Sequence, residues 1–332
     1  MTKFERRYGF TMEPESQELA AQLSKRDELL SKAATPEEKR KIFSARQFNT
    51  APEFQDVASV RELQIESADS QIGCRLYHPS PGDLHHCLVW FHGGGHHSGD
   101  LDSHDHLCRI IAIETGCAVL NVDYRLAPDH PFPAAYNDAV AAVRWVGREG
   151  NSFDLRTDSV LVGGSSAGGN LAAAAAIGMR DERGVHIIHQ CLISPVLDAT
   201  MSSDTYQIYA TGFSLTTAQR RQSRDWYCGD FDDLRDPRLS PLFVADCAGL
   251  PAATILAAEL DPVRGESERY AVRLIEAGVP VTYVCYAGTM HGFFSQSGAL
   301  KRGADAVSQA IASIRFAISA YTAREPHRIQ IR

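Results

Sequence analysis

The sequence Gly164-Ser165-Ser166-Ala167-Gly168 is a G-x-S-x-G pattern that follows an apolar run and precedes an alanine-rich stretch. A serine in a sharp turn between a strand and a helix is held above the sheet, where its hydroxyl can attack a substrate. The next backbone N–H, from Ala167, faces the same side and can stabilise an oxyanion. The pattern therefore predicts Ser166 as a nucleophile. The alternative is an ordinary glycine-rich or phosphate-binding turn, but no G-K-[ST] follows, which excludes a P-loop.

A serine hydroxyl is a poor nucleophile without a general base, and in this type of site the acid and then the histidine follow the serine along the chain. Four histidines follow it here: His186, His189, His291 and His327. The first two lie near the start of a predicted strand, and the last lies in a charged tail. His291 stands in a loop just after the predicted strand 281–287, and we therefore predict it as the base.

The predicted acid is Asp261, which ends an apolar strand and is followed by proline. Proline stops the strand and leaves the carboxylate at its carboxyl edge. There Asp261 would accept a hydrogen bond from His291, fix its tautomer and stabilise the imidazolium. Glu259, Glu266 and Asp198 are the competing carboxylates.

A fourth feature is the sequence His92-Gly93-Gly94-Gly95 after the apolar run 87–91. Three glycines allow backbone N–H groups to point inward with no side chain in the way, and such a loop can supply the second half of an oxyanion hole. Each donor is worth about 3 kcal/mol of the reaction barrier. The alternative is a flexible glycine turn without a catalytic role.

Short apolar runs and helical stretches alternate from about Val60 onward, which indicates βαβ units and an α/β fold with a mostly parallel central sheet and helices on both faces. The predicted strands are 60–65, 73–78, 87–92, 117–124, 159–164, 187–196, 252–260 and 281–287. The predicted helices are 104–116, 134–149, 168–180, 266–278 and 302–322.

Two segments do not follow this alternation. Residues 12–45 are predicted to be helical, with a capping box at Thr35-Pro36-Glu37-Glu38. Residues 198–240 contain several aromatic side chains but no strong strand. We therefore expect an N-terminal helical arm at 1–55, a core formed by 56–197 and 241–325, and an inserted cap at 198–240. The aromatic residues Tyr206 and Phe213 are candidate substrate contacts within the cap.

Composition limits the function further. The chain of 332 residues has 33 basic and 41 acidic residues, and its net charge of −8 argues against nucleic acid as a partner. No apolar stretch approaches the roughly 18 residues of a membrane span, and the N-terminus does not resemble a secretory signal, so we expect a cytoplasmic protein. Its eight cysteines form no C-x-x-C pair, which favours buried free thiols.

The chain resembles the hormone-sensitive lipase family of esterases. The resemblance rests on FHGGG at 91–95, DYRLAPDHPFPAAYND at 123–138, GGSSAGGNLA at 163–172, LDPVRGESERYAVRLIEAGV at 260–279 and HGF at 291–293. It implies an α/β-hydrolase fold with a helical cap, no cofactor, and a small-molecule ester with a short acyl group as substrate. It also implies Ser166, Asp261 and His291 as the catalytic triad, with Gly94, Gly95 and Ala167 as oxyanion donors.

The sequence departs from the family at two places. Ser165 stands where the family often has an acidic residue, and His96 and His97 follow the glycines where an apolar or aromatic residue is usual. We expect at least one of these histidines to contact substrate; the alternative is that both are exposed loop residues. Three alternative functions stay open: an amidase or lactonase with the same triad, a metal-dependent hydrolase using the histidine-rich loop 92–106, and an inactive binding protein. A homodimer stays open as well.

Overall fold

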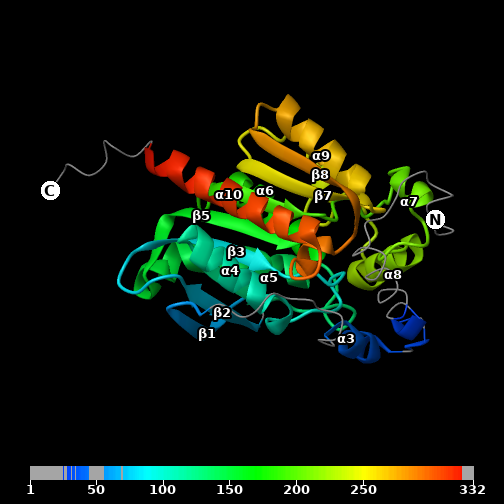
Figure 1. Cartoon of the computed structure of the whole chain (residues 1–332), viewed down its shortest axis with the longest axis horizontal. Helices are drawn as coiled ribbons and strands as arrows, with labels where there is room; N and C mark the ends of the chain where they lie inside the picture. The colour runs from blue at the N-terminus through cyan, green and yellow to red at the C-terminus, as the bar shows by residue number, and fades with distance from the viewer. Residues whose placement is uncertain are drawn as a thin grey trace.

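In a computed structural model of the chain, the structure describes residues 25, 28–30, 32, 33, 35–44, 56–68 and 70–323. Its centre is one eight-stranded sheet in the order β1-β2-β4-β3-β5-β6-β7-β8 (Figure 1). Strands β1 and β4 both pair with β2 in the antiparallel sense, and every other neighbouring pair is parallel. The mostly parallel sheet predicted from the sequence is confirmed.

The strands are β1 Ser59–Glu66, β2 Gln71–His78, β3 His85–Phe91, β4 Ala118–Asp123, β5 Leu155–Ser165, β6 Ile187–Ile193, β7 Ala252–Leu260 and β8 Val281–Met290. The α-helices are α3 Pro36–Ser44, α4 Asp105–Thr115, α5 Ala134–Glu149, α6 Ala167–Asp181, α7 Thr205–Ile208, α8 Thr217–Cys228, α9 Arg264–Glu276 and α10 Lys301–Ala323. Short 3₁₀ helices are η2 Asp102–His104, η3 Gly150–Phe153, η4 Pro241–Phe243 and η5 Phe293–Gln296. Each predicted strand overlaps an observed one, although β6 ends earlier than predicted because Ser194 adopts a φ of 41°.

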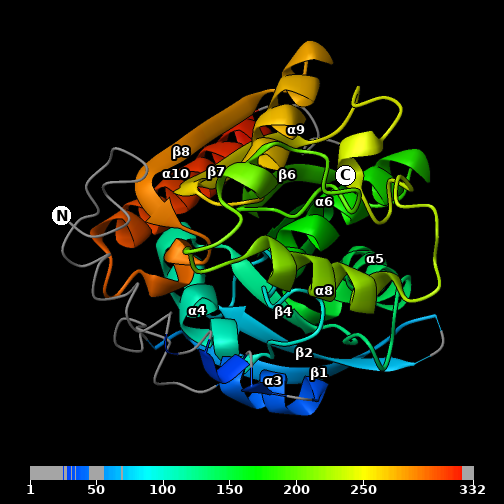
Figure 2. The same cartoon turned by 90° about the vertical axis from the view of Figure 1, so that its right-hand side faces the viewer.

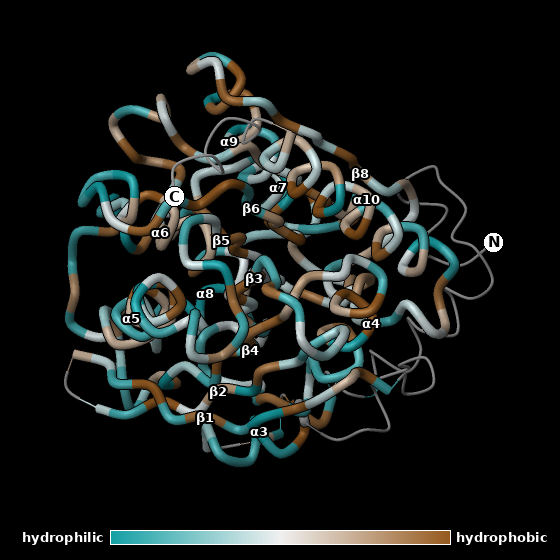
Figure 3. Tube along the Cα trace, turned by 90° about the vertical axis from the view of Figure 1, so that its left-hand side faces the viewer, coloured by the Kyte–Doolittle hydropathy of each residue, from teal (hydrophilic) through white to brown (hydrophobic). Residues whose placement is uncertain are grey.

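Helices cover both faces of the sheet (Figures 1 and 2). Helices α5, α6 and α9 pack on one face, and α4 and α10 pack on the other. Successive strand residues alternate between the two cores, as the twofold period of a strand requires: in β3, Val89 and Phe91 face the first core, whereas Leu88 and Trp90 face the second. Figure 3 shows apolar positions gathered in the central strands and hydrophilic stretches on the outside.

Two helical segments lie at the carboxyl edge of the sheet (Figure 2). Residues 198–240 contain α7 and α8 and no strand, as predicted. Helix α3 begins with the predicted capping box, in which Thr35 Oγ1 accepts from the Glu38 amide and Glu38 Oε2 accepts from the Thr35 amide, each at 3.2 Å. Much of the predicted helical stretch 12–45, and of the arm 1–55, lies outside the described residues.

The state of the cysteines and the character of the helices bear on two further expectations from the sequence. All eight cysteines are free thiols and seven of them are buried, as the sequence predicted. Within the residues that the structure describes, no helix has both the length and the apolar character needed to span a membrane.

A buried ion pair anchors the segment 123–138, which runs from β4 to the start of α5. Asp138 is fully buried and accepts from the Arg125 guanidinium at 2.8–3.2 Å, from the Arg125 amide at 2.9 Å and from Ser67 Oγ at 2.6 Å. Tyr124, beside this pair, donates its hydroxyl to the His92 carbonyl at 2.8 Å. The ion pair therefore fixes the backbone from which the glycine loop after β3 is held.

We predict that Asp138→Ala lowers the free energy of unfolding by about 3–5 kcal/mol, because it leaves the buried Arg125 charge without a partner. Chemical denaturation measures this change. The matched control is Glu114→Ala, which removes a half-exposed pair with Arg315 between α4 and α10 and should cost less than about 1 kcal/mol. Equal losses in the two variants would contradict the role assigned to the Arg125–Asp138 pair.

Candidate active site

Ser166 lies in a strained turn between β5 and α6. Its backbone has φ 55° and ψ −114°, a region that side chains other than glycine rarely occupy. The turn is also tight, since a Cβ at Gly168 would lie 1.9 Å from the Phe91 carbonyl oxygen of β3. Glycine at this position is therefore a steric requirement, and it brings the start of α6 against the end of β3.

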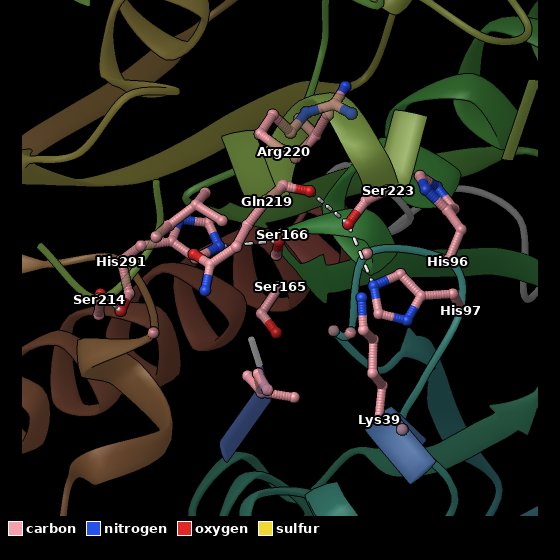
Figure 4. A pocket seen from close by; sticks show the side chains of 18 of the residues that line it. Lys39, His96, His97, Ser165, Ser166, Ser214, Gln219, Arg220, Ser223 and His291 are labelled. Atoms are coloured by element: carbon pink, nitrogen blue, oxygen red, sulfur yellow. Dashed lines mark hydrogen bonds between the residues drawn. The ribbon is translucent and has the colours of Figure 1, made fainter. Parts of the chain in front are cut away.

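Ser166, Asp261 and His291 lie together at the carboxyl edge of the sheet, each one residue beyond the end of β5, β7 or β8. His291 Nε2 is 2.8 Å from Ser166 Oγ (Figure 4). His291 Nδ1 is 2.7 Å from Asp261 Oδ2. Asp261 is fully buried, and its second oxygen accepts from the Val263 amide at 3.0 Å. The arrangement can move a proton from the serine hydroxyl to an imidazole whose orientation a carboxylate fixes.

The three competing carboxylates are engaged elsewhere. Asp198 accepts from the amides and hydroxyls of Thr200 and Ser202. Glu259 accepts from the Gly288 amide at 2.7 Å. Glu266 accepts from the Tyr206 hydroxyl and from the amides of residues 197 and 198. Of the four candidate acids, the structure brings Asp261 to His291.

The glycine loop after β3 presents free backbone donors beside the serine. Gly94 has a φ of 126°, and a Cβ there would lie 2.0 Å from the Ser98 carbonyl oxygen, so the loop requires glycine at this position. The amides of Gly94 and Gly95 donate no hydrogen bond within the described residues. The Ala167 amide opens α6, where the first N–H groups of a helix have no partner inside the helix. These amides can stabilise a negative charge that develops near Ser166.

A cavity of about 570 Å³ opens above Ser166. Its walls come from the glycine loop, the turn around Ser166, residues 214–223 of the inserted segment, α3 and the loop after β8 (Figure 4). The candidate substrate contacts His96 and His97 both line it. Tyr206 and Phe213 are not among the lining residues, contrary to the expectation from the sequence. Both are buried, since Tyr206 holds Glu266 and the Phe213 ring packs edge-on against Tyr209.

His96 and His97 differ in their surroundings. The His96 ring is buried and stacks on Tyr227 with ring centroids 3.7 Å apart. In the part of the chain that the structure describes, its Nε2 has no hydrogen-bond partner. His97 Nε2 lies 3.1 Å from Ser223 Oγ, and its ring meets the Trp226 ring edge-on. Burial lowers the pKa of His97 to about 4 and that of His96 well below its ordinary value. Both imidazoles are therefore neutral at pH 7.

Several polar contacts around the cavity were not predicted from the sequence. Ser165 Oγ lies 3.4 Å from the buried His104 Nε2, and both residues line the cavity. Ser214 Oγ, from the inserted segment, donates to the His291 carbonyl at 2.6 Å. Arg40 of α3 donates to the carbonyls of His97 at 2.8 Å and Ala127 at 2.9 Å, beyond the glycine loop. No sequence pattern signals these contacts, because they join segments that are far apart in the chain.

The histidines of the segment 92–106 have different partners and do not converge on one point. His92 stacks on Tyr124, with centroids 4.3 Å apart, and its Nδ1 lies 2.8 Å from the Gly93 carbonyl. Over the part of the chain that the structure describes, no three His, Cys, Asp or Glu side chains form a group that could hold a metal ion. This geometry does not favour the reading of 92–106 as a metal site.

Comparison with known proteins gives consistent matches. Residues 88–295 match a family model described as the α/β hydrolase fold. Carboxylic ester hydrolase LipN of Mycobacterium tuberculosis is 40% identical over 71% of this chain, and the match spans 64% of that relative's length. Carboxylesterase NlhH of the same species is 33% identical over 83% of this chain and 88% of its own. The structure of an ester hydrolase from the metagenome of Lake Arreo is 35% identical, with a TM-score of 0.88 over 93% of this chain and 100% of that one.

Burial of neutral histidines around the cavity has a consequence for stability. The pKa of His104 is held well below its ordinary value, mainly by burial. The unfolded chain therefore binds a proton at this histidine near pH 6.5, whereas the folded chain does not. As the pH falls below 6.5, protonation of the unfolded state lowers the free energy of unfolding, and above that pH this loss is absent. We predict that His104→Gln makes the fall in unfolding free energy between pH 6.5 and 5 shallower by about 1 kcal/mol per pH unit.

Denaturant titrations across this pH range measure the slope. The control is His130→Gln at an exposed position, where the slope should match that of the parent protein. Parallel curves for the parent and His104→Gln would show that His104 is not held neutral in the folded state.

Proposed function

The chain belongs to the family of hormone-sensitive lipase-like esterases with the α/β-hydrolase fold, and on this premise we propose that it hydrolyses short-acyl carboxylic esters through a triad of Ser166, His291 and Asp261. The observation that carries the proposal is the continuous chain of short contacts from Ser166 Oγ through both ring nitrogens of His291 to the buried Asp261. Sequence relatives that are named as carboxylic ester hydrolases support ester cleavage as the reaction.

In the proposed acylation step, Ser166 Oγ attacks the ester carbonyl carbon while His291 Nε2 takes the hydroxyl proton. The carbonyl oxygen becomes an oxyanion and accepts hydrogen bonds from the amides of Gly94, Gly95 and Ala167. His291 then returns the proton to the leaving alcohol, and an acyl-enzyme on Ser166 remains. A water molecule, deprotonated by His291, then attacks the acyl carbon. As the bond from this carbon to Ser166 Oγ breaks, His291 returns the proton to Oγ, which releases the carboxylic acid and restores the serine.

Asp261 is assigned a positioning role. Its carboxylate holds the proton of His291 on Nδ1, which leaves Nε2 as the acceptor facing Ser166, and it stabilises the imidazolium that forms during both steps. The Val263 amide and complete burial fix the carboxylate in turn. A carboxylate without a mobile hydration shell keeps the imidazole in one orientation throughout the reaction.

We also propose that residues 198–240 and the arm 1–55 act as a cap over the core formed by 56–197 and 241–325. Residues 214–223 and Lys39 of α3 support this division, since they line the cavity opposite the serine. Pockets for small molecules occupy about 300–1,000 Å³, and a cavity of about 570 Å³ is in the range for a small ester. The limited volume of the cavity supports a preference for short acyl groups.

Replacement of the nucleophile tests the triad. Ser166→Ala should lower kcat on 4-nitrophenyl butyrate by on the order of 10⁵-fold or more, because the nucleophile and its base act as one unit. Unchanged denaturation would show that the variant is folded. In the parent protein an organophosphate should modify Ser166, and peptide mass spectrometry locates the adduct. An adduct on Ser165 or Ser194 would contradict the assignment.

The acyl preference is tested with 4-nitrophenyl esters from acetate to dodecanoate. We expect kcat/KM to be highest among the shorter acyl groups and to fall for the longer ones, which exceed what the capped cavity accommodates. The measurement should use substrate concentrations below micelle formation. If kcat/KM instead rises steadily to the long acyl chains and increases at a lipid interface, the proposed short-acyl preference is wrong.

A further inference from the structure

Among the described residues, the charged side chains that line the catalytic cavity are all cationic. The described residues that line it include the two cations Lys39 and Arg220 and no aspartate or glutamate. The chain as a whole has the opposite balance, with 41 acidic against 33 basic residues. A cavity lined by one sign of charge concentrates ligands of the other sign, so this cavity is suited to a negatively charged substrate.

Lys39 reaches the cavity from α3 and points toward His97 (Figure 4). Its Nζ donates to Gln222 Oε1 at 2.6 Å and lies 4.8 Å from the centroid of the Trp226 ring. Among the described residues it has no carboxylate partner. An ammonium group carries three donors, so two of them are available to a ligand after the bond to Gln222.

Arg220 of α8 is the second cation, and it is only 6% exposed. Among the described residues, its Nε has no hydrogen-bond partner and its guanidinium forms no ion pair. The carboxylate that acts on it at longer range is Glu266, which already accepts from the Tyr206 hydroxyl and two backbone amides. Buried donors without partners are unfavourable, and a bound anion would satisfy them.

The neighbouring histidines respond to the same positive field. Next to burial, the charge of Arg220 is what lowers the pKa of His96, and the charges of Lys39 and Arg40 lower that of His97. A field that disfavours a positive imidazolium at these positions favours a negative group in the cavity that both histidines line. Both imidazoles stay neutral. The charged side chains on this side of the cavity are therefore Lys39 and Arg220.

We propose that the physiological ester carries a free carboxylate. The substrate is then either a half-ester of a dicarboxylic acid or a hydroxy acid that is acylated on its hydroxyl group. Lys39 and Arg220 are the specificity-determining residues, and the carboxylate pairs with one of them in the field of the other. This inference rests on the proposed function, since it assigns a substrate class to the same serine site.

Two pairs of esters of matched shape test the inference. Ethyl hydrogen succinate is compared with ethyl 4-methylpentanoate, which places the charge on the acyl side. Acetoxyacetate is compared with isobutyl acetate, which places it on the alcohol side. In each pair a carboxylate replaces an isopropyl group, and kcat/KM is measured by acid release at pH 7.5 and low salt. The readout is the ratio of charged to neutral ester relative to the parent, so intrinsic differences in reactivity cancel.

The variants are Lys39→Gln and Arg220→Gln, with Lys41→Gln as the control because Lys41 is an exposed lysine of the same helix. In at least one pair, Lys39→Gln and Arg220→Gln should each lower the ratio about tenfold or more, the loss expected for a charge-assisted hydrogen bond. Lys41→Gln should stay within twofold of the parent. Added salt should lower the ratio of the parent and affect Lys39→Gln less. If buried Arg220 is needed for folding, Lys39→Gln alone decides.

Ratios within threefold of the parent in both pairs, for every variant that folds, would overturn the inference while leaving the proposed function intact. A parent protein that hydrolyses the neutral esters and is at least a hundredfold slower on both charged ones would do the same. If the parent hydrolyses none of the four esters, the proposed function fails first. The pair that responds identifies the acyl or the alcohol side as the position of the carboxylate.

Discussion

The close contact between the start of α6 and the end of β3 is the constraint on which the rest of the site depends. A side chain at Gly168 would collide with the Phe91 carbonyl, so only glycine allows the two segments to approach this closely. The turn around Ser166 precedes this contact on one side, and the glycine loop follows Phe91 directly on the other. One steric requirement in the sheet therefore sets the distance between Ser166 and the loop amides, and their geometry does not depend on flexible side chains.

The polar groups around this contact are held in sequence, from a buried carboxylate outward to the side chain that faces the cavity. Asp261 is fully buried and bound to the backbone, His291 is bound to Asp261, and Ser166 is bound to His291. The glycine loop is held in a comparable way, since Tyr124 donates to the His92 carbonyl beside the Arg125–Asp138 pair. In each case a buried charge with several donors orients the less buried group that faces the cavity. This preorganisation is what the stabilisation of a transient oxyanion requires.

Much of the fold could be predicted because its signals are local. The twofold and 3.6-residue periods, the glycines and the proline after Asp261 each act within a few residues, and all eight strands were found from them. The order of motifs placed Ser166, Asp261 and His291 at the same sheet edge, since the carboxyl ends of parallel strands share an edge. The cavity walls formed by α3 and by the inserted segment could not be predicted in this way. Lys39, Ser165 with His104, and Ser214 meet their partners across long sequence separations, and the side chains of Tyr206 and Phe213 turn into the core, although their aromatic character suggested a binding surface.

The docking of α3 on the glycine loop suggests how substrate choice could change during divergence. Arg40 donates to the carbonyls of His97 and Ala127, which every amino acid possesses, and not to their side chains. A mutation that replaces the imidazole at position 97 would alter the cavity wall and keep the acceptor for Arg40. Selection could therefore explore new side chains beside Ser166 while the helix stays in its place. Because the hydrogen bonds from Arg40 go to the backbone, Arg40 must be retained, whereas the side chain at position 97 is free to vary.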